Sequence, residues 1–363
     1  MQIQIQTFTV NKRFPLTISR GTTTQSTNIW VRIQHDGIEG WGEASPFSTG
    51  KQPSTSKQPS TSKQPQTPEV IVAKLQAVVP HLQPFSPFDQ QAIAQICRHH
   101  NLTSAAHAAI DIALHDWVGK RVGLPLWQLW GLERSRIVPT SVTIGISSPA
   151  AARQRMLDWL QVTPVKAVKV KLGSLAGTAA DQAMLLAVKE VAPADAKFSI
   201  DANGGWNLEA AIALSHWLAD QGVTYIEQPL PAGQEQDLPT LYRRSPLPIF
   251  VDESCFTSSD IPGLSDRVHG INIKLMKSGG LTEALRMIHT AHAHGLQIML
   301  GCYSDSILAN TAAPIAPFAD HLDLDSHLNL IDDPFTGAMM QNGCLIPNDL
   351  PGLGVGLSSQ LRV

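Results

Sequence analysis

Eight short apolar runs alternate with helix-like segments between Val138 and Met340. The strand-like runs are Thr140–Ile144, Ala167–Lys171, Phe198–Asp201, Thr224–Glu227, Ile249–Asp252, Ile271–Lys274, Gln297–Leu300 and Leu322–Asp325. The helix-like segments between them include Ala150–Leu160, Ala179–Val191, Leu208–Gln221 and Leu281–His294. Strands that alternate with helices predict a parallel sheet, and eight of them predict a closed (β/α)8 barrel. We therefore predict an α/β fold with its barrel in residues 133–342.

The first third of the chain follows a different pattern. Polar and apolar residues alternate in Gln2–Val10 and in Ile29–Gln34, which predicts antiparallel strands joined by turns at glycines. From Pro68 to Gly131 the apolar residues recur at helical spacing. Residues 1–132 are therefore predicted to form an α+β domain. The tail, residues 343–363, is predicted to rejoin that domain.

A tandem repeat interrupts this first domain. Lys51-Gln-Pro-Ser-Thr-Ser is followed by Lys57-Gln-Pro-Ser-Thr-Ser and then by Lys63-Gln-Pro-Gln. A segment so rich in Pro, Ser and Thr cannot bury an apolar core. Residues 51–66 are therefore predicted to form a low-complexity surface loop.

Charge and cysteine content exclude several classes of protein. The chain has 27 basic and 30 acidic residues, so it has no excess of basic charge for a nucleic acid or an anionic membrane. Its four cysteines form no CxxC pair, which argues against a zinc ribbon or a disulfide framework. No apolar run has the length of a transmembrane helix. We expect a cytoplasmic protein that has no membrane or nucleic-acid partner.

Charged residues stand at the ends of the predicted strands, where barrel enzymes keep their catalytic groups. They are Lys169 and Lys171 on strand two, Asp201 on three, Glu227 on four, Asp252 on five, Lys274 on six, and Asp323 with Asp325 on eight. A single Asp at a strand end is common in turns, but three carboxylates on consecutive strands would converge at the barrel mouth. Oxygen ligands without His or Cys favour Mg²⁺. Asp201, Glu227 and Asp252 are therefore the predicted metal ligands.

The lysines would flank that metal site. Lys169 and Lys171 lie on one face of a strand, and two adjacent ammonium groups make the loss of one proton easier. Strands two and six stand nearly opposite each other in an eight-stranded barrel, so Lys171 and Lys274 would reach a substrate from opposite faces. One lysine could remove an α-proton while the other returns a proton to the opposite face. We predict a 1,1-proton transfer.

Several motifs resemble those of the enolase superfamily, in its muconate lactonizing enzyme subgroup. They are Lys169-Val-Lys171, Asp201-Ala-Asn, Glu227-Gln-Pro, Asp252-Glu-Ser, Asn272-Ile-Lys274-Leu-Met-Lys-Ser-Gly-Gly, Ala113-Leu-His-Asp-Trp-Val-Gly-Lys and Gly40-Trp-Gly-Glu. The resemblance spans nearly the whole chain. It implies that the first domain caps the barrel mouth and that each subunit holds one Mg²⁺, and it leaves a homo-oligomer possible. The subgroup contains muconate cycloisomerases, o-succinylbenzoate synthases, N-succinylamino acid racemases and dipeptide epimerases.

Asp323-Leu-Asp325 favours one of these reactions. Alternation places both carboxylates on one face, and free carboxylates at the mouth would suit the α-ammonium group of a dipeptide. The same pair would repel muconate or a succinyl group, although Asp323 could also be a helix cap or an outer salt-bridge partner. Dipeptide epimerases, including L-Ala-D/L-Glu epimerases, carry an Asp-x-Asp at this strand. We expect a dipeptide epimerase; an N-succinylamino acid racemase, an o-succinylbenzoate synthase and a non-catalytic binding barrel remain alternatives.

The resemblance also implies roles for further residues. Lys169 would hold the substrate carboxylate beside Mg²⁺, Thr143 would contact the substrate, and Arg20 would meet a glutamate side chain. The run Gly301-Cys-Tyr-Ser-Asp-Ser departs from the Gly-x-Met-x-Glu that is common in the subgroup. The repeat falls at the second capping loop, where an insertion could widen the lid over the substrate.

Overall fold

The computed structural model describes residues 1–19, 21–48, 66–311 and 315–358. Arg20 and residues 51–65 of the repeat therefore lie outside the described residues. Gln66 was predicted to end a surface loop, but it is buried. Its backbone exchanges two hydrogen bonds with Phe47, and its side chain bonds Ser104 and Ala105. The predicted loop is thus wrong at its last residue, because that residue anchors the chain to the cap.

Eight parallel strands form a single sheet in sequence order, so each strand lies beside its neighbours in the chain. They are β4 (Ser141–Ile144), β5 (Ala167–Lys171), β6 (Lys197–Asp201), β7 (Val223–Glu227), β8 (Ile249–Val251), β9 (Gly270–Ile273), β10 (Gln297–Gly301) and β11 (His321–Asp323). A bridge between Thr140, just before β4, and Leu322 of β11 joins the last strand to the first. The predicted (β/α)8 barrel with an α+β domain beside it is confirmed.

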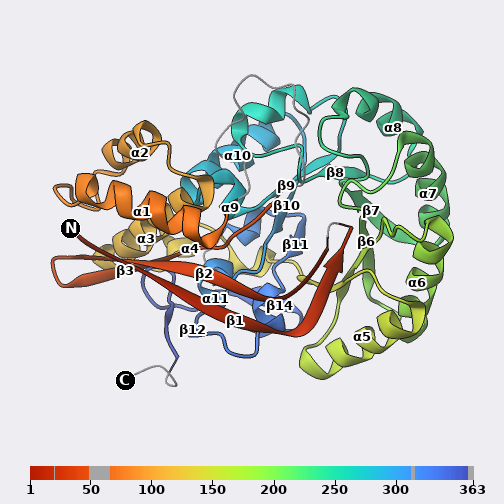
Figure 1. The fold of residues 1–363 in the computed structure, drawn as a ribbon, viewed down its shortest axis with the longest axis horizontal. Coiled ribbons are helices and arrows are strands. Elements are labelled where there is room, and N and C mark those ends of the chain that lie inside the picture. The colour runs from red at the N-terminus through yellow and green to blue at the C-terminus, as the bar shows by residue number, and fades with distance from the viewer. Residues whose placement is uncertain (20, 49–65, 312–314, 359–363) are drawn as a thin grey trace.

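Helices form the outer layer of the barrel (Figure 1). The outer α-helices are α5 (Pro149–Val162), α6 (Thr178–Val191), α7 (Leu208–Asp220), α8 (Leu238–Arg244) and α10 (Leu281–Ala293). Two short helices, α9 (Leu275–Ser278) and α11 (Ile307–Thr311), pack against α3 and β3 of the cap instead. Short 3-10 turns are η2 (Arg134–Arg136), η3 (Glu235–Asp237), η4 (Ser258–Gly263), η5 (Ala316–Phe318) and η6 (Ser326–Asn329). Ser148 and Asn207 accept backbone N–H bonds at the starts of α5 and α7, which explains where these two helices begin.

The cap consists of an antiparallel meander and four helices. Its elements are β1 (Gln2–Ile18), β2 (Gly21–His35), β3 (Ile38–Ala44), α1 (Pro68–Leu82), α2 (Gln90–His99), α3 (Ser104–Val122) and α4 (Leu126–Leu129). Helix α3 packs directly on β3, because Gly40 and Gly42 have no side chain to hold it away. A Cβ on Gly42 would lie 2.0 Å from the Ala109 carbonyl oxygen, so this close approach requires glycine. The Gly-Trp-Gly-Glu motif is therefore in part a packing device.

The end of the chain contacts the cap. It contains β12 (Phe335–Thr336), β13 (Met339–Gln341), β14 (Cys344–Ile346) and β15 (Gly356–Leu357). The Phe335 ring packs edge-on against Trp41 of β3, with 5.8 Å between centroids. The Leu353 N–H donates to the buried carboxylate of Asp116 in α3. These contacts support the prediction that the tail rejoins the first domain, while the boundaries at 132 and 342 stay predictions.

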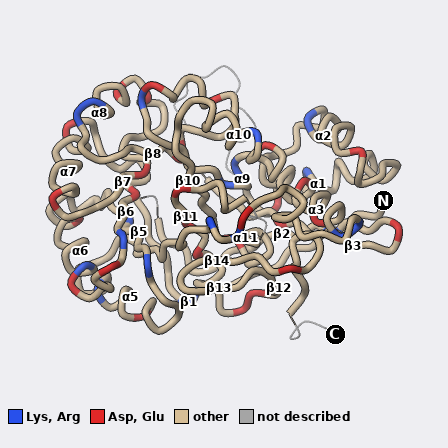
Figure 2. The backbone as a smooth tube through the Cα atoms, turned by 180° about the vertical axis from the view of Figure 1, so that it is seen from behind, with Lys and Arg blue, Asp and Glu red and all other residues tan. Residues whose placement is uncertain are grey.

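Acidic and basic residues are interspersed along both parts of the chain (Figure 2). Among the helices of the described ranges, none has the length and apolar character needed to cross a membrane.

Candidate active site

Three buried carboxylates stand at the carboxyl ends of neighbouring strands. Asp201 ends β6 and Glu227 ends β7, and the two residues are partners in the parallel ladder. Asp252 follows immediately after β8, which ends one residue earlier than predicted. All three side chains are at most 1% exposed. The barrel thus brings the three predicted metal ligands to the same end of the sheet, as their positions on consecutive strands require.

The turns after these strands hold the carboxylates in place. Asn203 has a left-handed backbone, with φ of 44°, and donates from its own N–H to Asp201 Oδ1 at 2.7 Å. Gln228 is also left-handed, with φ of 37°, and its side-chain oxygen accepts the Asp252 N–H at 2.8 Å. Non-glycine residues in this region are strained and often lie at functional sites. Sequence reasoning gave these two residues no role, although the Asp-Ala-Asn and Glu-Gln-Pro motifs contained them.

Lys169 lies at the centre of the site and is fully buried. Its ammonium is 2.5 Å from Glu227 Oε2, 2.6 Å from Asp323 Oδ2 and 3.4 Å from Asp201 Oδ2. Burial alone would lower the pKa of Lys169, but the three carboxylates outweigh burial and raise it well above its ordinary value. Of the two adjacent lysines, Lys169 is therefore held in its charged form by the carboxylates, which suits the predicted role of holding the substrate carboxylate rather than that of a base.

The two predicted acid–base lysines each face a different carboxylate. Lys171 Nζ lies 2.6 Å from Asp201 Oδ2, and Lys274 Nζ lies 2.8 Å from Asp252 Oδ2. Burial lowers the pKa of Lys274, but Asp252 outweighs burial and raises it well above its usual value. Asp252 also contacts a second lysine. The ammonium of Lys277 lies 2.5 Å from Asp252 Oδ1 and donates to three backbone carbonyls. Lys277, three residues after Lys274, was missed by sequence reasoning.

The donor set fits a hard divalent cation. No three Asp, Glu, His or Cys side chains in the described part of the chain stand as a ready cage for a metal ion. Instead, ammonium groups already lie against the three carboxylates, so positive charge is what these positions attract. Burial, and next the charge of Asp201, raise the pKa of Glu227 to about 7. Burial and neighbouring carboxylates thus outweigh the contact with Lys169, and a cation bound to these oxygens would further stabilise the charge of an ionised Glu227.

Asp323 and Asp325 both face β4. Asp323 Oδ1 accepts from Ser141 Oγ at 2.8 Å, and Asp325 Oδ2 accepts the Thr143 N–H at 2.7 Å. The expectation of two free carboxylates does not hold for Asp323, because its other oxygen is paired with Lys169. Burial and the charge of Asp323 raise the pKa of Asp325 to about 7. Of these two carboxylates, Asp325 is therefore the one that would gain more from an added cationic group.

Side chains of the cap reach the loop between β10 and α11. Lys12 donates to Ser304 Oγ at 2.9 Å, and Glu43 accepts the N–H groups of Ser306 and Ala309. These contacts place the cap over the carboxyl ends of the strands. Lys12 and Glu43 were not predicted as site residues, although Glu43 belongs to the Gly-Trp-Gly-Glu motif.

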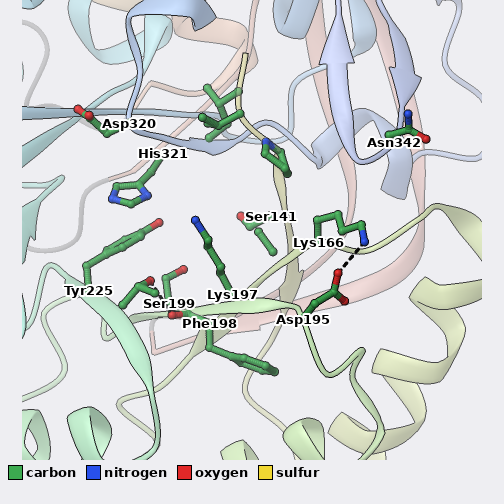
Figure 3. Close-up of a pocket in the computed structure, with 15 residues that line it drawn as sticks. Ser141, Lys166, Asp195, Lys197, Phe198, Ser199, Tyr225, Asp320, His321 and Asn342 are labelled. Atoms are coloured by element: carbon green, nitrogen blue, oxygen red, sulfur yellow. Dashed lines mark hydrogen bonds and ion pairs between the residues drawn. The ribbon is translucent and has the colours of Figure 1, made fainter. Parts of the chain in front are cut away.

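A separate cavity opens at the amino ends of the strands (Figure 3). It has a volume of about 380 Å³, and Lys197, Tyr225 and His321 are among the residues that line it. In barrel enzymes this end of the strands serves stability, whereas chemistry takes place at the other end. The cavity therefore does not compete with the ring of lysines and carboxylates as the candidate active site.

A (β/α)8 barrel with lysines and carboxylates at its carboxyl ends, beneath an α+β cap, defines one class of barrel enzyme. A family model described as "Enolase C-terminal domain-like" matches residues 150–361. A second, described as "Mandelate racemase / muconate lactonizing enzyme, N-terminal domain", matches residues 2–131. The chain belongs to the enolase superfamily, in the mandelate racemase and muconate lactonizing enzyme family.

Characterised relatives span the same length. A hydrophobic dipeptide epimerase from a Flavobacteria bacterium is 42% identical, and the match covers 99% of each chain. The L-Ala-D/L-Glu epimerase of Bacteroides thetaiotaomicron is 34% identical over 98% of this chain and 88% of its own. A dipeptide epimerase from Cytophaga hutchinsonii, solved with Mg and D-Ala-L-Val, superposes with a TM-score of 0.89 at 26% identity. That match covers 99% of this chain and 96% of the solved one.

Proposed function

We propose that this protein is an Mg²⁺-dependent isomerase that epimerises dipeptides at the α-carbon of the C-terminal residue. The observation that carries the proposal is the pair of buried lysines, Lys171 and Lys274, each held by a different carboxylate of the same ring. Binding alone has no need of two such lysines, whereas inversion at a carbon needs an acid and a base on opposite faces. The full-length similarity to dipeptide epimerases supports the same reaction.

Each charged residue then has a stated role. Asp201, Glu227 and Asp252 would hold one Mg²⁺ per chain. The bound metal would supply positive charge that stabilises the negative charge developing on the substrate carboxylate. Lys169 would add its ammonium on the same side, where it is fixed by three carboxylates.

The two remaining lysines would carry the proton. One of them, Lys171 or Lys274, accepts the α-proton from its face of the substrate, and the other donates a proton to the opposite face. Each must be neutral to act as the base, and for Lys274 the partner Asp252 favours the charged form. A cation shared with Asp201 and Asp252 would weaken both ion pairs and would make the deprotonation of Lys274 easier.

The dipeptide class is supported by Asp325. A buried carboxylate with a raised pKa is stabilised by a cationic partner, and the α-ammonium group of a dipeptide supplies one. An N-succinyl substrate would instead bring a second negative charge toward Asp323 and Asp325. The similarity to a hydrophobic dipeptide epimerase makes dipeptides with an apolar C-terminal residue the first choice.

The test is proton exchange in D2O. The purified protein with Mg²⁺ is incubated with L-Ala-L-Leu, L-Ala-L-Glu and N-succinyl-L-Leu, and the α-carbon is followed by NMR. We expect deuterium and inversion at the C-terminal residue of a dipeptide, with L-Ala-L-Leu the best of the three. Exchange with N-succinyl-L-Leu and with neither dipeptide would support the racemase alternative and overturn the proposal.

The pH dependence of binding tests the role of Asp325. With its pKa at about 7, the carboxylate is ionised above that pH and becomes neutral below it. Affinity for a dipeptide, relative to its N-acetylated analogue, should therefore fall by about tenfold per pH unit below 7. Calorimetry with Mg²⁺ present measures both ligands, and the ratio removes effects common to them. In Asp325→Asn the ratio should be low and independent of pH; an unchanged pH profile would remove Asp325 from ammonium recognition.

A further inference from the structure

Tyr303, in the loop that follows β10, lies between the cap and a proposed catalytic lysine. Its ring stacks on Phe47, with 4.7 Å between centroids and 12° between planes. The ammonium of Lys274 lies 4.6 Å from the centroid of the same ring. A cation over an aromatic face is attracted by the electrons of the ring. The Tyr303 ring therefore contacts Phe47 of the cap and the ammonium of Lys274 at once.

Lys274 is restrained from three directions. Its ammonium is 2.8 Å from Asp252, and its stem runs close to Gly301, where an added Cβ would lie 3.0 Å from Lys274 Cε. Tyr303 provides the third contact, and its ring is itself packed against Phe47 of the cap. Removing the ring would leave the end of a flexible side chain with room to move.

The cap holds the Tyr303 loop at several points. Phe47 is fixed beside Gln66 by two backbone hydrogen bonds, and Gln66 is bonded in turn to the start of α3. Further along the loop, Lys12 bonds Ser304 and Glu43 bonds Ser306. The position of the Tyr303 ring is therefore set by cap residues as much as by β10.

Lys171 is positioned differently. Its carboxylate partner, Asp201, is its ladder neighbour on the adjacent barrel strand. The barrel itself thus fixes Lys171, whereas Lys274 depends also on a ring that the cap supports.

We propose that Tyr303 is a positioning residue that makes proton transfer at the Lys274 face of the site depend on the packing of the cap. The inference rests on the proposed function, because it assigns Lys274 to one face of the α-carbon.

The test compares Tyr303→Leu with Tyr303→Phe, which keeps the ring, and with Tyr242→Leu as a control. Tyr242 belongs to α8, on the outside of the barrel, where its ring stacks on His269. Each antipode of the dipeptide is incubated with enzyme and Mg²⁺ in D2O, and both deuterium exchange and inversion are measured. We expect Tyr303→Leu to slow inversion by about tenfold or more. Exchange should survive for the antipode that Lys171 deprotonates and fall for the other. Tyr303→Phe and Tyr242→Leu should behave like the wild type.

Three results distinguish the possible failures. If exchange of both antipodes falls equally in Tyr303→Leu, the residue acts on the whole site and the inference is wrong. If Tyr303→Phe is as slow as Tyr303→Leu, the hydroxyl matters rather than the ring face, and the inference is again wrong. If the wild type exchanges neither antipode, the proposed function is wrong, and this inference, which rests on it, is wrong as well. A crystal structure of Tyr303→Leu without substrate should show the Lys274 ammonium displaced, and an unmoved ammonium would contradict the inference without reference to activity.

Discussion

Lys274→Ala is expected to slow epimerisation by about a thousandfold, within the usual range for loss of an acid–base group. The variant should nevertheless still exchange the α-proton of one antipode with solvent. Lys171 remains in place against Asp201 and can remove and return a proton on its own face. Without Lys274 no proton reaches the opposite face, so exchange continues without inversion. Lys171→Ala should show the mirror image, with exchange retained for the other antipode.

NMR in D2O measures this prediction, with each pure antipode as the starting substrate. Lys197→Ala is a matched control, because Lys197 stands at the amino end of β6 and lines the cavity at the opposite end of the barrel. It should retain wild-type rates. If Lys171→Ala and Lys274→Ala exchange the same antipode, both lysines serve one face and the two-base mechanism is wrong. If either variant still inverts its substrate at the wild-type rate, that lysine carries no proton.

The sequence was sufficient to place the ring of charged residues because strand ends are simple to locate. An apolar run that stops at a charged residue and a turn marks the carboxyl end of a barrel strand, and Asp201 and Glu227 are such cases. The predicted strand ends at Asp252 and Lys274 were each one residue too late. Both were placed inside strands, but the backbone leaves the ladder just before them to enter the next loop or helix.

Contacts between side chains could not be read from the sequence in the same way. Two lysines on one strand suggested mutual repulsion, but Lys169 proved to be surrounded by three carboxylates from three other elements. Burial lowers the pKa of Lys169 and the nearby carboxylates raise it, and only the distances in the structure show which effect is larger. Tyr303 is a second example. Its departure from the subgroup motif was visible, but the ring's contacts with Phe47 and Lys274 depend on how the cap docks.

Asp252→Asn and Glu227→Gln should both weaken Mg²⁺ binding by about a hundredfold or more, because each removes one of the three proposed charged ligands and leaves two. Their effects on stability should differ. Asp252 is the partner of two buried ammonium groups, those of Lys274 and Lys277. Leaving buried charges without their partner costs about 3–5 kcal/mol. Asp252→Asn should therefore lose stability on that scale.

Glu227→Gln should be far less destabilising. After this change Lys169 still has Asp323 as a partner, which lies 2.6 Å away in the wild type. Burial also makes the charged form of Glu227 itself costly. Isothermal titration with Mg²⁺ measures the first effect, and urea unfolding without metal measures the second. A small loss of stability in Asp252→Asn would show that Lys274 and Lys277 do not depend on Asp252. If the Mg²⁺ affinity is unchanged in both variants, these carboxylates do not belong to the metal site. If both variants lose Mg²⁺ binding and only Asp252→Asn loses much stability, Asp252 has two separable roles. It would hold the metal and also neutralise the lysine that moves the proton.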